Sequence, residues 1–483
     1  MPLRPLCREQ AWLLPPSLDE LLAQDHAARF VAAFVDGLSP AALAELEIDK
    51  EGAVLGAPAY HPCALLAVWL YGFMTGVRSS RRLEAACHDQ IPMLWLTGCQ
   101  RPDHNTLWRF YRSHRPAMRR LLKETVAIAV TVGYVDLALQ AVDGTKVGAN
   151  ASRDRSYDAP GLAKLMARAE AAIAALEAQN QQDEAAPPPM PAELGRAQSL
   201  KERVRAAQAR LAAEGHKQVN LTDGDALLMK SRQGILPAYN AQAVVSPLGG
   251  GEGQRHGMLI TAADVVAETT DYRQLRPMLE EAQGMTGARS PTVLADGGYY
   301  TGANLAVGYE RGQRLVIPQQ QRGRDRGDYF KDRFRYDVAS DSYQCPQGQQ
   351  LHFRGLTKAR GKTSVRVYAA PKQVCHHCPA YGVCTRDQHA GRVLWIGPDD
   401  IRLRQHRSWM ETEEAHRLYA QRKELIEPVF GIIKEQLGGR RFLLRGLANV
   451  RAEFTLLATA FNLRMLWRQW TTRRLPAWRA CYS

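Results

Sequence analysis

Apolar residues recur at helical spacing at both ends of the chain. In the N-terminal part the spacing predicts helices over residues 18–34, 62–73 and 106–118. Near the C-terminus it predicts two long helices, over residues 417–437 and 450–470. The two ends of the chain are therefore expected to be helical.

A different pattern begins at Leu137, where short apolar, β-branched runs are bounded by glycine or polar residues. Such runs are typical of buried strands. They cover residues 137–147, 227–245, 257–263 and the segment PTVLAD that ends at Asp296. Residues 270–283 predict a helix between the last two strands. This order of elements predicts an α/β core with a mixed sheet.

Two Ala-rich segments interrupt the predicted core. Residues 160–178 and 193–214 have helical composition, and a Pro-rich stretch separates them. We expect them to form a helical hairpin, spanning residues 155–216, inserted into the core.

The predicted N-terminal helices carry a basic face. The pair Ser79-Ser80 offers a cap for a short helix, and Asp103 or Asn105 can cap the next one, which carries Arg109 and Arg112. Two short helices followed by an Arg-bearing helix are typical of a helix-turn-helix-like DNA-binding module, which we assign to residues 1–130. An ordinary helical bundle with a basic face explains the same residues.

Composition narrows the class of protein. The chain has 483 residues, enough for two to four structural units, and its 45% apolar content excludes wholesale disorder. It carries 63 Lys and Arg against 49 Asp and Glu, a net charge of +14. Sixteen of these cations and seven acids lie between residue 401 and the C-terminus. This surplus indicates a polyanionic partner such as DNA.

No segment has the apolar length of a membrane span, and the N-terminus lacks the apolar core of a signal peptide. We therefore expect a cytoplasmic, nucleoid-associated protein with reduced cysteines and no membrane partner. Five of the nine cysteines are scattered and are expected to be small buried residues. They are Cys7, Cys63, Cys87, Cys99 and Cys481.

Three acidic residues are candidates for phosphoryl-transfer chemistry. Asp143 and Asp296 each follow an apolar strand pattern and precede glycine, so each is expected at a strand end. Glu427 lies in a predicted helix. Cutting DNA requires two divalent ions about 3.5–4 Å apart, and Mg²⁺ prefers carboxylate oxygens. The three acids are therefore candidate ligands of two Mg²⁺ ions.

The residue spacing around Glu427 predicts which side chains share a face of this helix. Glu427, Phe430 and Lys434 are spaced to share one face, whereas Glu424 and Glu435 are expected on other faces. Pro428 is expected to kink this helix or to begin a new one.

The acidic blocks resemble those of a known family. VDGTKVGANAS, LADGGYYTG and the pattern Y-x2-R-x4-E-P-V-F-G-x2-K from Tyr419 to Lys434 resemble the three catalytic blocks of DDE transposases of bacterial insertion sequences. The N-terminal stretch from His61 to His114 resembles the helical N-terminal domain of the group with a Tyr-Arg-Glu-Lys signature. The resemblance covers about residues 15–470.

This resemblance implies a ribonuclease H-like core formed by residues 135–318 and 396–472. It implies that Asp143, Asp296 and Glu427 hold two Mg²⁺ ions, that water cuts the transposon end, and that the freed 3′-hydroxyl attacks target DNA. Tyr419, Arg422 and Lys434 would contact the DNA. Four residues separate Arg422 from Glu427 where related signatures often have three, so Lys423 is an alternative signature cation. Such enzymes commonly work as homodimers on paired ends.

A second cluster lies between the second and third acids, in a polar insertion over residues 319–395. Cys345, Cys375, Cys378 and Cys384 have the spacing C-x29-C-x2-C-x5-C. Four thiols with a C-x2-C pair predict a structural zinc site in a reducing compartment. Reduced, partly buried thiols are the alternative.

Three other functions are compatible with the sequence. A zinc-containing DNA-binding protein without catalysis would use the same basic segments, but it has no need for the three acids. A ribonuclease H-like nuclease that cuts without joining would share every ligand. A degenerate transposase would bind transposon ends without cutting them.

Overall fold

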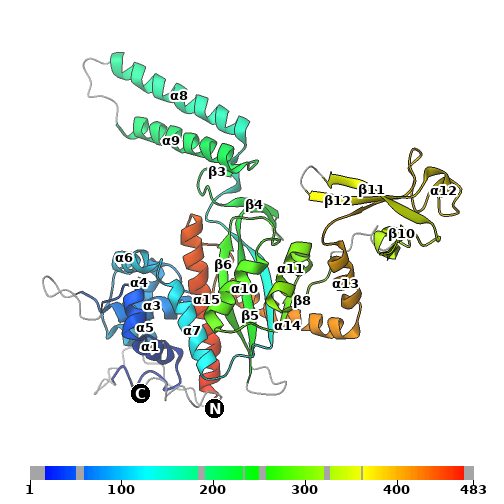
Figure 1. Ribbon diagram of the computed structural model, residues 1–483. Helices are drawn as coiled ribbons and strands as arrows, with labels where there is room; N and C mark the ends of the chain where they lie inside the picture. The colour runs from blue at the N-terminus through cyan, green and yellow to red at the C-terminus, as the bar shows by residue number, and fades with distance from the viewer. Residues whose placement is uncertain are drawn as a thin grey trace, which may run out of the picture.

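A mixed β-sheet forms the centre of the computed structural model, which describes residues 17–49, 59–182, 191–231, 234–249, 257–319, 327–359 and 363–472 (Figure 1). Its strand order is β6-β5-β1-β7-β8, with β4 also paired to β5. The pairs on the β5 side of β1 are antiparallel, whereas β1, β7 and β8 run parallel. The strands are β1 (Leu139–Gly148), β4 (Leu227–Ser231), β5 (Gly234–Leu248), β6 (Gly257–Val266), β7 (Thr292–Ala295) and β8 (Arg314–Val316). The structure thus confirms the expected α/β class with a mixed sheet.

Helices cover both faces of the sheet because alternate residues of each strand are apolar and buried. Ala141 lies in one core with Leu425 of α14, whereas the next residue, Val142, lies in another with Leu279 of α10. The first face is covered by α14 (Glu413–Glu435) and α15 (Leu447–Thr471). The second is covered by α10 (Leu275–Thr286) and α11 (Gly302–Arg311).

The N-terminal part is helical, as predicted. Its helices are α1 (Ala27–Asp36), α2 (Pro40–Glu45), α3 (Pro62–Met74), α4 (Ser80–Asp89), α5 (Ile91–Thr97), α6 (His104–His114) and α7 (Arg119–Thr131). The Ser79 hydroxyl caps α4, and the Asp103 carboxylate caps α6 by accepting from two backbone amides. The helix predicted from Leu18 begins only at Ala27, because the His26 side chain caps it there.

Helix α15 joins the N-terminal helices to the sheet. The buried Asn462 amide accepts from the Ile260 backbone N–H at 2.8 Å and donates to the Ile260 carbonyl at 2.9 Å, so it pairs with β6. It also donates to the Thr125 hydroxyl of α7 at 3.1 Å. A single buried amide therefore ties α15 to elements on both sides of it.

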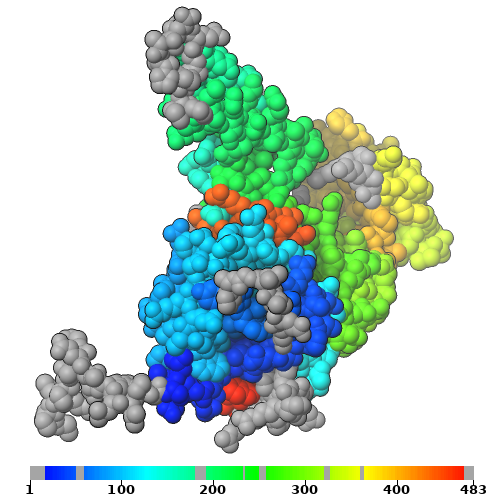
Figure 2. Space-filling view, turned by 90° about the vertical axis from the view of Figure 1, so that its left-hand side faces the viewer, coloured from blue at the N-terminus to red at the C-terminus, as the bar shows by residue number. Residues whose placement is uncertain are grey.

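The predicted hairpin consists of α8 (Ala159–Gln182) and α9 (Pro191–Glu214) and projects away from the sheet (Figures 1 and 2). Leu162, Val204 and Leu221 form a small core at its base. A two-stranded ladder of β2 (Ser156–Tyr157) and β3 (Val219–Asn220) closes that base.

The insertion between the second and third acids has a sheet and a core of its own. Its elements are β9 (Arg335–Asp337), β10 (Ser342–Gln344), β11 (Gln350–Ala359), β12 (Thr363–Ala369), α12 (Lys372–His376) and β13 (Val393–Ile396). Seven buried side chains, among them Phe334 and Leu351, form the core. Helix α13 (Asp400–Met410) then leads back to α14.

Two details differ from the sequence predictions. Helix α14 continues through Pro428, so no new helix begins there. Cys63 and Cys87 are buried as expected, but Cys99 is exposed because it lies in the turn after α5; Cys7 and Cys481 lie outside the described residues.

None of the helices in the described part of the chain combines the length and the apolar character needed to cross a bilayer.

Candidate active site

The two predicted aspartates lie side by side on neighbouring strands. Val142 of β1 is paired with Ala295 of β7, so Asp143 and Asp296 follow directly at the same level of the sheet. Asp296 comes at the end of its strand, as predicted. Asp143 does not, because β1 continues to Gly148 by pairing with β5. Only the ladder between β1 and β7 ends before Asp143.

The side chains of both aspartates point to the same face of the sheet. Asp143 is two residues from Ala141 and Asp296 is two residues from Leu294, and both apolar residues belong to the core beneath α14. The strand period of two therefore directs both carboxylates towards α14.

Burial makes this pair of carboxylates hard to ionise. Desolvation raises the pKa of Asp143 to about 6; the Arg422 guanidinium lowers the pKa and the neighbouring Asp296 raises it. Desolvation also raises the pKa of Asp296, again opposed by Arg422. Removal from water is therefore the main reason why the charged forms of both carboxylates are disfavoured.

Arg422 is the cation of α14 that reaches this pair. Its Nη2 lies 2.7 Å from Asp143 Oδ2, and the two side chains are 10% and 16% exposed. Tyr419, about one turn earlier, is half-buried beside Arg422, and burial raises its pKa. Lys423 is exposed. The structure thus brings Arg422, and not Lys423, to the carboxylates.

Glu427 lies in a groove that also contains Asp143. The groove has a volume of about 940 Å³ and is lined on one side by β1 and on the other by α14. Glu427, Phe430 and Lys434 all line it, so they share one face of the helix as predicted. Glu435 lines it too, against expectation, and pairs with Arg440 at 2.6 Å.

The groove is rich in cations. Lys434 Nζ donates to the Thr145 hydroxyl at 2.6 Å, which fixes the end of α14 against β1. The other basic residues that line the groove are Lys146, Lys230, Arg440 and Arg441. Arg109 and Arg112 are exposed on α6 and do not line it. A groove with carboxylates at one point and cations along its walls suits a phosphodiester backbone.

A third aspartate, Asp271, lies close to Asp143 and Asp296 and was not among the residues predicted from the sequence. Asp271 Oδ1 accepts from Asn240 Nδ2 and Gln242 Nε2, both at 2.7 Å, and lies 3.9 Å from Lys146 Nζ. Its charge raises the pKa of Asp143 and of Asp296. The sequence placed Asp271 in a helix, but α10 begins only at Leu275, and the preceding loop carries the carboxylate to the sheet.

Gly144 makes this arrangement possible. A Cβ at this position would lie 2.2 Å from Gln242 Nε2 and 2.5 Å from Asp271 Oδ1. The glycine after Asp143 is therefore required by the close approach of Asp271 and its amide partners.

The two aspartates offer ligands for a divalent cation. Asp143 and Asp296 supply hard oxygen donors from adjacent strands, and burial disfavours their charged forms, which a bound cation would stabilise. Over the described ranges, however, no three side chains of His, Cys, Asp or Glu are placed to share one ion. The two aspartates fit such a group, and Glu427 lies in the same groove outside their immediate contact.

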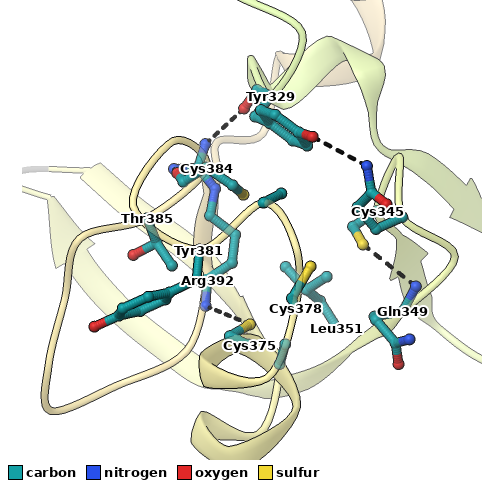
Figure 3. A pocket seen from close by; sticks show the side chains of 13 residues that line it. Tyr329, Cys345, Gln349, Leu351, Cys375, Cys378, Tyr381, Cys384, Thr385 and Arg392 are labelled. Atoms are coloured by element: carbon teal, nitrogen blue, oxygen red, sulfur yellow. Dashed lines mark hydrogen bonds between the residues drawn. The ribbon is translucent and has the colours of Figure 1, made fainter.

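The four clustered cysteines lie elsewhere, in the insertion. Cys345, Cys375, Cys378 and Cys384 line one small cavity, and all four are free thiols (Figure 3). None of them lines the groove that contains Asp143.

The fold and the groove define a basic α/β protein with paired carboxylates facing a cation-lined surface. Two segments of the chain match protein families: residues 344–467 match the transposase DDE domain, and residues 16–113 match a transposase domain (DUF772). The first match contains Glu427 and all four clustered cysteines, whereas Asp143 and Asp296 precede it. No curated protein and no solved structure gave a match.

The two matches support a DDE transposase of the insertion-sequence type. The transposase DDE domain implies an enzyme of the nuclease and transferase class, and the transposase family implies DNA as the partner.

Proposed function

We propose that this transposase cuts DNA at the ends of its mobile element and joins the freed 3′-hydroxyl groups to target DNA. The observation that carries the proposal is the pair Asp143 and Asp296 on adjacent parallel strands, covered by the helix that carries Glu427. In a transposase, a partly buried carboxylate such as Asp143 in a cation-lined groove suits the DNA backbone as substrate.

The strand order supports a ribonuclease H-like core over residues 135–318 and 396–472. Three antiparallel strands, β6, β5 and β1, continue into two parallel ones, β7 and β8, and the carboxylates lie at the centre of this sheet. We assign residues 1–130 to DNA-end binding through Arg109 and Arg112, and residues 319–395 to a separate insertion.

Asp143, Asp296 and Glu427 would hold the Mg²⁺ ions of this site. Bound there, two such ions would supply activation of the attacking oxygen and stabilisation of the leaving oxygen. Glu427 needs a rearrangement to join the aspartates, because no trio of donors is assembled in the described structure. We expect DNA binding in the groove to drive that movement, since catalytic contacts often tighten only in the complex.

The surrounding residues have distinct roles in this proposal. Arg422 balances the charge of Asp143 and holds α14 over the sheet. Tyr419, Lys434 and the exposed Lys423 are proposed contacts to DNA phosphates near the cut, and Asp271 positions Lys146 beside the carboxylates. Two copies of the chain are expected to act on paired ends.

The test is cleavage of a supercoiled plasmid that carries the DNA flanking the gene, with purified protein and Mg²⁺. Wild type is expected to release discrete end fragments and to form joined products. Asp296→Ala and Glu427→Ala should bind the same DNA and leave it intact. Glu424→Ala is the matched control, because Glu424 is exposed on the same helix and does not line the groove.

Other results of this cleavage experiment would indicate a different function. Cleavage without joined products identifies a nuclease. Binding without cleavage under Mg²⁺ or Mn²⁺ identifies a DNA-binding protein or a degenerate transposase. Cleavage by Glu427→Ala at the wild-type rate contradicts the proposed ligand set.

A further inference from the structure

The insertion between β8 and α13 has little apolar interior to stabilise it. Its core of seven buried side chains lies on one side of the small sheet of β9 to β13. The segment between α12 and β13 contains no strand in the described structure, and its Cys384 packs against this core. Small units with such cores usually need an additional crosslink.

Four cysteines from three separate segments surround one cavity at this end (Figure 3). Cys345 begins the turn between β10 and β11, Cys375 lies in α12, and Cys378 and Cys384 lie in the segment that follows. The cavity has a volume of about 20 Å³. A space of that size holds about one water molecule, so it suits a single ion and excludes an organic ligand.

The backbone around two of these cysteines is arranged for thiolate ligands. The Gln349 N–H donates to Cys345 Sγ at 3.3 Å, and the Arg392 N–H donates to Cys375 Sγ at 3.2 Å. Gly348 has a φ of +80°, which allows the tight turn that brings the Gln349 amide back to Cys345. Hydrogen bonds from backbone amides favour the charged form of a sulfur ligand.

The nearby histidines are engaged elsewhere. His376 Nε2 lies 3.2 Å from the Asp387 carbonyl and His377 Nδ1 lies 2.8 Å from the Gln373 carbonyl, and neither ring lines the cavity. Arg392 does line it, and its guanidinium donates to the Cys384 carbonyl at 3.0 Å. This cation would offset the negative charge of an all-thiolate site.

We propose that Cys345, Cys375, Cys378 and Cys384 together bind one structural zinc ion. Binding replaces four S–H bonds by four Zn–S bonds and releases four protons to solvent. Side-chain rotation is needed, because in this part of the described chain the sulfurs surround the cavity without three of them being placed to share an ion. The ion would join the β10–β11 turn, α12 and the following segment into one unit.

The other end of the insertion is fixed without these cysteines. Lys331 pairs with Asp400 of α13, and Arg404 of α13 donates to the Phe334 carbonyl at 2.9 Å. Arg407 of α13 donates to Asp332 at 2.6 Å. Loss of zinc should therefore loosen the distal end of the insertion and leave α13 and the sheet folded.

The experiment measures zinc in the full-length protein purified from zinc-supplemented cells under reducing conditions. Wild type is expected to carry about one zinc per chain. Cys378→Ser and Cys384→Ser should lose most of it, whereas Cys99→Ser should not, because Cys99 is exposed and outside the cavity. Wild type without zinc, or serine variants that keep it, would overturn the proposal.

A second measurement uses wild type alone, in case the serine variants do not fold. Cobalt(II) exchanged into the protein should show thiolate-to-metal charge-transfer absorption, and zinc should slow the reaction of the four thiols with a thiol reagent. Absence of both effects would overturn the site. Neither readout involves DNA cleavage, so the zinc site and the proposed function can fail independently.

Discussion

At the scale of single residues, the ion pair of Arg422 and Asp143 links α14 to the sheet. Both groups are largely removed from water, so neither is easily replaced by solvent. Breaking such a pair by removing one partner typically costs about 3–5 kcal/mol, because the other charge stays buried. The pair places Arg422, rather than the exposed Lys423, beside Asp143.

We predict that Arg422→Ala lowers the free energy of unfolding by about 3 kcal/mol or more in the absence of divalent ions. The loss should be larger at pH 8 than at pH 5, because the unpaired Asp143 can be neutralised by a proton at the lower pH. Urea unfolding at both pH values measures this effect.

Lys423→Ala is the matched control. Lys423 is exposed, so its removal should change stability by less than about 0.5 kcal/mol and leave cleavage nearly unchanged. If Lys423→Ala abolishes cleavage while Arg422→Ala does not, Lys423 is the signature cation.

At the scale of elements, charged residues join α7, α10, β6 and α15 at the β6 edge of the sheet. Glu281 of α10 lies 3.3 Å from Arg119 of α7, which is 3.7 Å from Asp264 of β6. Arg451 of α15 lies 3.1 Å from the same Asp264. Burial raises the pKa of Glu281 to about 7; Arg119 lowers it and Asp264 raises it.

This shift predicts a pH-dependent stability. A raised pKa means that the folded state binds the proton more tightly, so the stabilisation is present below about pH 4.5 and is lost as pH rises through 7. Glu281→Gln should therefore stabilise the protein at pH 8 by up to about 3 kcal/mol and have little effect at pH 4.5. Thermal or urea unfolding across this range measures it.

Glu280→Gln provides the comparison, because Glu280 is a neighbouring exposed residue whose ion pairs should contribute little. An equal gain from both variants, or a gain from Glu281→Gln that does not depend on pH, would contradict the assignment.

The sequence predicted the elements that have strong periodicity and missed those set by tertiary contacts. Asp296 was found at a strand end because an apolar run precedes it. Asp143 was expected at a strand end, but pairing with β5 extends β1 to Gly148, and no local signal reveals the length of the partner strand. No local pattern predicts the position of Asp271, because only the folded chain brings its loop to Asn240 and Gln242.

Helix α14, which carries Glu427, also shows what the sequence could not predict. Its period correctly placed Glu427 and Lys434 on one face, but Glu435 was assigned to another. The groove is wide enough to include Glu435, and the contact with Arg440 holds it there. Helical spacing gives the direction of a side chain but not the breadth of the surface it faces.

At the scale of the whole molecule, the net charge of +14 dominates the expected behaviour with DNA. Each phosphate neutralised by Lys or Arg steepens the decrease of affinity with salt. We predict that Arg109→Ala with Arg112→Ala reduces the slope of log K against log salt by about two. Fluorescence anisotropy with end DNA at several salt concentrations measures that slope.

The double variant Lys164→Ala with Arg168→Ala is the matched control for the Arg109 and Arg112 variant. Its two residues lie at helical spacing on the exposed surface of α8. Its slope should equal that of wild type. If the slope falls only for the α8 pair, the projecting hairpin binds the DNA and the N-terminal domain is a helical bundle with a basic face.

The position of α14 and α15 so late in the chain has a consequence for synthesis. Asp143 and Asp296 emerge from the ribosome long before Arg422, Glu427 and Asn462 are synthesised. During that time one face of the sheet lacks the helices α14 and α15 that cover it. Domains fold as their segments emerge, and the α/β core cannot complete its folding until α14 and α15 have emerged. An unfinished chain therefore has both aspartates but not the groove between β1 and α14, so under the proposed function we expect it to leave the DNA beside its own gene intact.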